Sequence, residues 1–134
     1  MLKKTVKYTD FNGVERTEDF YFNLSKTELQ EMESSIPGGM SARLTTIQAA
    51  NDINEVMKFF KFIIMKSYGE KSPDGRRLIK EDGKLAEAFV ETPAYDIIFQ
   101  EFFVSEGNAL RDFLLAIVPA DISAQITKSL DNGN

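Results

Sequence analysis

Few side chains in this sequence are suited to chemistry, because its 134 residues include no histidine and no cysteine. The commonest general base, and the usual thiolate and zinc ligands, are therefore missing. The most promising polar run is Asp74-Gly75-Arg76-Arg77. It forms either a solvated turn whose arginines pair with nearby acids such as Glu70 or Glu81, or a docking point for a carboxylate or phosphate of a partner. A catalytic role has the least support.

Three other polar groups have simple explanations. Glu31-Met32-Glu33 and Lys80-Glu81-Asp82 lack the alternating oxygen ligands of a calcium loop, so we interpret both as surface charge. Gly38-Gly39 lacks the lysine and hydroxyl residue of a phosphate loop, so we interpret it as a helix stop. We expect no catalytic residue, no metal site and no cofactor.

The aromatic residues are more informative, since 11 of the 134 residues are phenylalanine. Phe59-Phe60 and Phe102-Phe103 are adjacent pairs, and neighbours on a helix point about 100° apart. Either helices pack on both sides of such a pair, or one member faces outward. Phe62 and Met65 also fall outside the apolar stripe of their predicted helix. A central helix is the favoured explanation, and the alternative is a surface for a partner helix that includes Phe62, Met65 and Phe103.

The charge is unevenly distributed along the chain. The net charge is −5, from 16 basic and 21 acidic residues, and residues 85–118 hold six acids against one arginine. Nucleic-acid binding is disfavoured, because affinity for phosphates depends on clustered lysine and arginine. A basic partner or simple solubility fits better. No apolar run approaches the roughly 20 residues of a membrane span, and the N-terminus lacks an apolar signal segment, so we expect a cytoplasmic protein without a membrane partner.

The N-terminal residues predict a β-hairpin, since apolar and polar side chains alternate on both sides of Asn12-Gly13. A two-residue turn at Asn12-Gly13 would place the apolar residues of the two strands on opposite faces. A three-residue loop, residues 11–13, pairs Asp10 with Val14 and gathers them on one face. We predict this second register, with a type I turn starting at Asp10 and a positive φ at Gly13. The shared face would contain Leu2, Val6, Tyr8, Phe20 and Phe22.

Helices are expected over most of the remaining chain. Ser25 and Glu28 form a capping box that predicts a helix over 26–35, ended by Pro37-Gly38-Gly39. Further helices are predicted over 41–50, over 53–67 after a cap at Asn51 or Asp52, from near Lys84, from Thr92-Pro93, from Asn108 after a break at Gly107, and from Pro119 to about Leu130. Residues 69–84 are predicted to be the chief loop. The stripe of the 53–67 helix would comprise Ile53, Val56, Met57, Phe60, Ile63, Ile64 and Tyr68.

The predicted fold class is α+β, mostly α, with an N-terminal antiparallel β-hairpin packed on a bundle of about five or six helices. We expect a single domain over 1–134, made of the hairpin (1–24), a helical part (25–130) and a frayed polar tail (131–134).

Two runs resemble a known family. Residues 8–26 and 68–77 are similar to the tail assembly chaperones of long-tailed, siphovirus-type phages and prophages of Gram-positive bacteria, and residues 89–94 and 118–121 are weaker matches. The resemblance implies a protein without catalytic activity that binds the tape-measure protein, keeps it soluble and helps recruit tail-tube subunits. It also implies action in the host cytoplasm and absence from the mature virion.

The resemblance and the residues together define the expected partner contacts. We expect Phe62, Met65, Phe103, Arg76 and Arg77 to contact a partner, and we expect self-association through the helical part. The alternative function is a structural tail-completion or connector protein that stays in the virion, because the edges of an exposed hairpin could extend a sheet around a ring.

Overall fold

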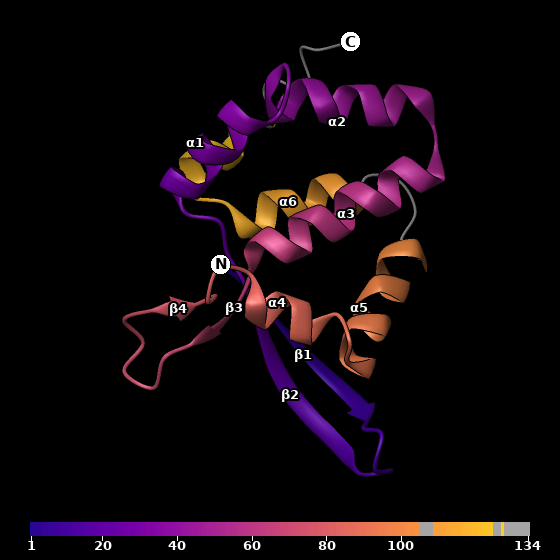
Figure 1. Cartoon of the computed structure of the whole chain (residues 1–134). Helices are drawn as coiled ribbons and strands as arrows, with labels where there is room; N and C mark the ends of the chain where they lie inside the picture. Colours follow the sequence, from indigo (N-terminus) through magenta and orange to yellow (C-terminus); the bar gives the residue numbers. More distant parts are fainter. Residues whose placement is uncertain (105–108, 125–126, 128–134) are drawn as a thin grey trace.

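The computed structural model describes residues 1–104, 109–124 and 127, and its fold is α+β, mostly α. Figure 1 shows a helical body from which two hairpins project. In chain order the elements are β1 (Leu2–Thr9), β2 (Glu15–Phe22), α1 (Lys26–Ser35), α2 (Gly39–Ala50), α3 (Ile53–Ser67), β3 (Tyr68–Lys71), β4 (Leu78–Ile79), α4 (Lys84–Phe89), α5 (Pro93–Val104) and α6 (Ala109–Ile117). A further helical stretch covers residues 120–124.

The first hairpin has the predicted register. Leu2 pairs with Phe22 and Thr9 with Glu15, which leaves Asp10 opposite Val14. The Asp10 amide donates to the Val14 carbonyl at 2.9 Å, and the Gly13 amide donates to the Asp10 carbonyl at 3.0 Å. Gly13 has a φ of 80°, the left-handed conformation that the predicted turn requires. The shared apolar face packs against the helices, with Val6, Phe20 and Phe22 buried.

The link from the hairpin to α1 also closes the ends of two other helices. The Ser25 hydroxyl accepts from the Glu28 amide at 3.1 Å and the Glu28 carboxylate accepts from the Ser25 amide at 2.9 Å, so the predicted capping box is confirmed. Just before it, the Asn23 amide donates to the Ser67 carbonyl and the Leu24 amide donates to the Ile117 carbonyl. These bonds satisfy carbonyls that the ends of α3 and α6 would otherwise leave unpaired.

Helix α3 is the centre of the core. Phe59 and Phe60 are both buried, so helices pack on both sides of this pair, as the favoured interpretation predicts. The Phe60 ring stacks on Phe102 of α5 with centroids 4.0 Å apart and meets the edge of Phe113 of α6 at 5.2 Å. The prediction for Ile53 was wrong, because its side chain is 55% exposed. It lies in the first turn of α3, whose buried residues begin only at Phe59.

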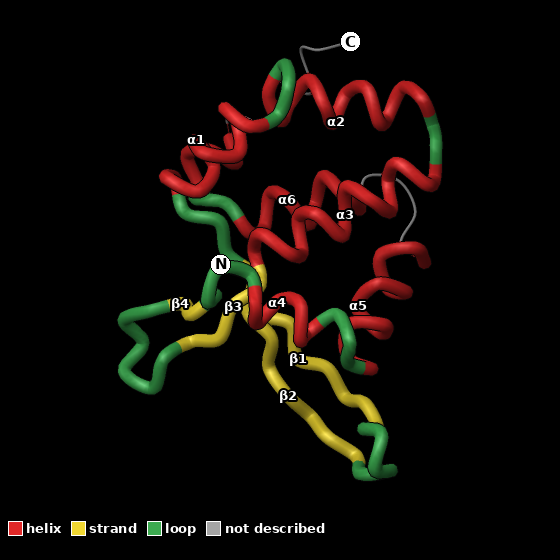
Figure 2. Tube along the Cα trace, viewed as in Figure 1, coloured by secondary structure: helices red, strands yellow, loops and turns green. Residues whose placement is uncertain are grey.

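The predicted loop over residues 69–84 was wrong in part, because it contains strands β3 and β4. Tyr21 pairs with Gly69 and Glu70 pairs with Ile79, which gives a four-stranded antiparallel sheet in the order β1-β2-β3-β4. Figure 2 shows the strands in yellow, with the first hairpin extending below the helical body and the second projecting to its left through a long green loop. A Cβ at Gly69 would lie 2.7 Å from Leu78 Cγ, so this position needs glycine for β3 and β4 to approach each other.

The other predicted helix boundaries agree with the structure closely. Helix α2 begins at Gly39, two residues before the predicted start at residue 41. Helix α5 begins at Pro93 as predicted, and the Thr92 hydroxyl caps it by accepting from the Tyr95 amide at 3.3 Å. The expected break at Gly107-Asn108, the end of the last helix near Leu130 and the tail over 131–134 lie outside the described residues. In the part of the chain that the structure describes, no helix is long and apolar enough to cross a membrane.

Candidate functional site

One of the expected contact residues, Met65, lines a groove between α1, the end of α3 and the start of α4. We call it the α1–α4 groove. Its volume is about 650 Å³, within the usual range for binding sites in proteins. Leu24 and Met32 are buried at its base, and Met65 is half-buried beside them. The polar lining consists of Glu28, Glu31, Ser35, Lys66, Lys80, Asp82, Gly83 and Glu87.

Lys80 holds one wall of the α1–α4 groove together. Its ammonium donates to the Asn23 carbonyl at 2.7 Å, the Lys66 carbonyl at 2.9 Å and the Glu28 carboxylate at 2.7 Å. These three acceptors belong to the end of the first hairpin, the end of α3 and the first turn of α1. Burial raises the pKa of Glu28, but the hydrogen bonds from Lys80 and from the Ser25 amide outweigh it, so the pKa lies below its ordinary value.

The remaining charge of the groove is negative. The side chains of Glu31, Asp82 and Glu87 form no ion pair with any other residue that the structure describes. The Lys80 charge is already matched by Glu28, and the Lys66 ammonium lies 5.8 Å from the centre of the Phe62 ring. The groove therefore combines a thioether side chain with an acidic rim.

Phe62 and Met65 are both half-buried on α3 and pack against the core. Met65 lines the α1–α4 groove, whereas Phe62 lies outside its lining and contacts the Phe59 ring at a centroid distance of 5.9 Å. Phe103 belongs to α5, and its side chain lies outside the described residues. The structure thus places one of these three residues in the groove.

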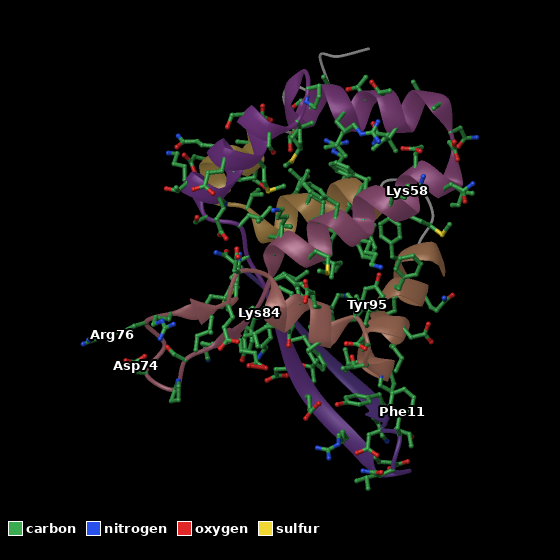
Figure 3. All side chains as sticks on the ribbon, viewed as in Figure 1. Phe11, Lys58, Asp74, Arg76, Lys84 and Tyr95 are labelled. Carbon is green, nitrogen blue, oxygen red and sulfur yellow. The ribbon has the colours of Figure 1, made fainter. Side chains whose placement is uncertain are left out.

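The tip of the first hairpin carries the most exposed large apolar side chain of the described residues. Phe11 is 86% exposed and Val14 is 52% exposed, and Figure 3 shows Phe11 at the end of the projecting strands. The Asp10 carboxylate fixes the turn, since it accepts from the Asn12 and Val14 amides at 2.9 Å each and from Arg16 Nε at 2.6 Å. The Arg16 bond, with the Val14 amide, lowers the pKa of Asp10. Phe11 is therefore an apolar group on a well-defined turn.

The comparison with known families gives a match over almost the whole chain. A sequence model described as phage tail assembly chaperone matches residues 1–132. The chain belongs to this family. No curated protein and no solved structure matches it.

Arg76 of this tail assembly chaperone lies at the end of the second hairpin, away from the helical body (Figure 3), and Arg77 follows it directly before β4. Within the described residues neither guanidinium forms an ion pair, so the expected pairing with Glu70 or Glu81 was wrong. The turn is held instead by Ser72 and Asp74. The Ser72 hydroxyl donates to the Asp74 carboxylate at 2.7 Å and accepts from the Arg77 amide at 3.0 Å, and the first bond lowers the pKa of Asp74.

The chaperone's surface contains contributors that the sequence did not single out. Phe11 was predicted only as a turn residue, and the structure shows its side chain 86% exposed at the tip of the first hairpin. The interpretation of Lys80 as surface charge was wrong, because its side chain is 18% exposed and donates to three acceptors. Glu87 was not singled out, and no local pattern brings these two residues together with Met65. The described residues include no group of three or more side chains arranged to hold a metal ion.

Proposed function

We propose that this chain binds the tape-measure protein during tail assembly, keeps it soluble and helps recruit tail-tube subunits, without catalysing a reaction. The observation that carries the proposal is the match to the phage tail assembly chaperone family over residues 1–132. The cytoplasm of the bacterial host is the compartment in which this work would take place.

The geometry offers separate surfaces for two partners. The α1–α4 groove contains Met65, and methionine adapts well to varied apolar partners. The hairpin tip with Phe11 and the second hairpin with Arg76 and Arg77 project in different directions from the helical body (Figure 3). We assign tape-measure binding to the helical part, with Phe62, Met65 and Phe103 as contacts. Recruitment of tube subunits falls to the hairpins.

Self-association through the helical part is included in the proposal. An apolar depression of about 240 Å³ lies between β1, α5 and α6, and its lining includes Phe60, Phe102 and Phe113. Phe60 and Phe113 are buried, so the half-buried Phe102 is the one of these three rings that a second copy could contact, and phenylalanine is enriched at protein interfaces. Light scattering at high concentration would give a mass above that of one chain. A monomeric mass throughout would remove this part of the proposal.

Co-expression tests the main proposal. Fragments that tile the tape-measure protein of the same phage are expressed with and without this chain, and their soluble fraction and gel-filtration profile are measured. At least one insoluble fragment should become soluble and elute together with the chain. The matched control is a co-expressed unrelated acidic helical protein of similar size, which should rescue none of them. If no fragment is rescued by this chain, it is not a tape-measure chaperone.

One feature favours a second function. Strand β1 is at the edge of the sheet, so its outer backbone groups have no strand neighbour on that side among the described residues. An edge strand can pair with another subunit, as expected of a structural tail-completion or connector protein that remains in the virion.

A further inference from the structure

The α1–α4 groove differs from an ordinary surface hollow in the kinds of groups that line it. Its lining consists mainly of side chains from α1, α3 and α4 and from the link before α4. Neither edge strand of the sheet, β1 or β4, contributes a residue to it. A partner that adds a strand needs an unpaired sheet edge, whereas a partner helix satisfies its own backbone and needs only side-chain contacts. The occupant that suits this lining is a helix.

The charge of the groove selects the kind of helix. Glu31 stands on α1 and Glu87 on α4, at opposite walls, and both carboxylates are exposed. Asp82 adds a third carboxylate to the lining, on a left-handed backbone with a φ of 56°. The basic groups are partly used, because Lys80 binds Glu28 and two backbone carbonyls. A partner with lysine or arginine on its flanks would pair with these walls, and a partner with acidic flanks would be repelled.

The base of the groove sets the third requirement. Met65 is half-buried there, above the buried side chains of Leu24 and Met32. An aliphatic side chain from the partner would cover Met65 and remove apolar surface from water, which is the usual source of affinity when a helix binds in a groove.

We propose that the α1–α4 groove binds a basic amphipathic helix, with an aliphatic residue placed on Met65 and lysine or arginine side chains facing Glu31 and Glu87. The identification of this helix as a segment of the tape-measure protein rests on the proposed function. The preference for a basic helix rests only on the groove.

The test uses the full chain and two dye-labelled 18-residue peptides with the same leucine stripe, one with lysine and one with glutamate on the polar face. Fluorescence anisotropy at low and at moderate salt gives the affinities. The lysine peptide should bind, the glutamate peptide should not, and Glu31→Lys should weaken binding about fivefold or more. Glu15→Lys makes the same charge change on the first hairpin and should alter the affinity less than about twofold. If Glu31→Lys and Glu15→Lys lower the affinity for the lysine peptide equally, the attraction depends on net charge alone and the proposal is overturned. The proposal is also overturned if the lysine peptide does not bind.

A second pair of variants tests the apolar contact. Met65→Ala should lower the affinity for the lysine peptide. Ile53→Ala, on the exposed first turn of the same helix, should leave that affinity unchanged. Circular dichroism confirms that each variant is folded. If Met65→Ala binds as tightly as the original chain, the helix does not use the groove. If Glu31→Lys instead dissociates an oligomer in sedimentation velocity, the groove holds a second copy of the chain, which also overturns the proposal.

The peptide result separates this inference from the proposed function. Binding of the lysine peptide in the groove without rescue of any tape-measure fragment would leave the groove assignment in place and remove the tape measure as its partner. If the chain rescues a fragment and the Glu31→Lys variant rescues it equally well, the proposed function is supported. The α1–α4 groove is then not the site that binds the tape-measure protein.

Discussion

Lys80 is the residue whose replacement tests the architecture of the groove most sharply. Its side chain is 18% exposed. Its ammonium donates hydrogen bonds to the Asn23 carbonyl after the first hairpin, to the Lys66 carbonyl at the end of α3 and to the Glu28 carboxylate in the first turn of α1. Lys80→Met keeps most of the length of the side chain and removes all three bonds. The matched control is Lys84→Met, four residues later, where the side chain is exposed.

The size of the effect follows from the three acceptors. Each backbone carbonyl that loses its charged donor costs about 1 kcal/mol, at the low end of the range because water can enter from the groove. The Glu28 ion pair adds about 0.5 kcal/mol, since that carboxylate is 35% exposed and screened by solvent. The sum is about 2.5 kcal/mol in the free energy of unfolding, or about 10 °C in Tm for a chain of this size. Lys84→Met should change stability by less than about 0.5 kcal/mol.

Urea unfolding followed by circular dichroism measures this difference, and its pH dependence adds a second check. The pKa of Glu28 is lowered in the folded chain from an ordinary value of 4.5. The stability that its ionisation contributes is therefore fully present above pH 4.5 and is lost as the pH falls through the lower folded-state pKa. The difference in the free energy of unfolding between the original chain and Lys80→Met should become smaller over that acid range. A gap below about 0.5 kcal/mol at pH 7, equal to that of Lys84→Met, would refute the role given to Lys80.

Three further substitutions follow from the fold, all measured by urea unfolding. Ser25→Ala removes the capping hydroxyl of α1 and should cost about 1 kcal/mol, and an unchanged stability would mean that the capping box does not contribute. Gly69→Ala places a Cβ 2.7 Å from Leu78 Cγ and 3.0 Å from the Ile79 carbonyl, and should cost about 1–3 kcal/mol; a neutral result would show that β4 can move away freely. Phe60→Ala should cost about 3–5 kcal/mol because the ring is buried against Phe102, and a loss below 1 kcal/mol would contradict the central position of α3.

The features predicted from sequence were those that depend on neighbouring residues. The hairpin register followed from the alternation of apolar side chains, since only one register buries Val6, Phe20 and Phe22 together. The start of α1 followed from Ser25 and Glu28, which bond to each other three residues apart.

The features that the sequence missed depend on tertiary contacts. Gly69-Glu70-Lys71 has no alternating pattern, and β3 exists because Tyr68 and Gly69 pair with Phe22 and Tyr21 of β2. Ile53 fits the apolar stripe of α3 by angle, but no other element covers the first turn of that helix sufficiently to bury it. Periodicity reports which face of a helix is apolar, and it does not report where along the helix its neighbours end.

The same distinction applies to the candidate site. Met65 was identified because its helical angle differs from that of the core stripe, and the structure places it in the α1–α4 groove. Its companions Glu31, Lys80 and Glu87 come from three other segments, so only the fold brings them to the same place. Arg76 and Arg77 were identified as part of a polar run, and the structure leaves both on the second hairpin rather than in the groove.

Quantitative mass spectrometry of phage assembly products tests the central claim most directly. Complexes that contain the tape-measure protein before tube assembly, and purified mature virions, are compared for the copy number of this chain. We predict many copies per tape-measure protein in the early complexes and none, beyond trace amounts, in the virion. A stoichiometric copy number in the virion, with no chain bound to the early tape-measure protein, would contradict the assignment as an assembly chaperone and favour a structural tail protein.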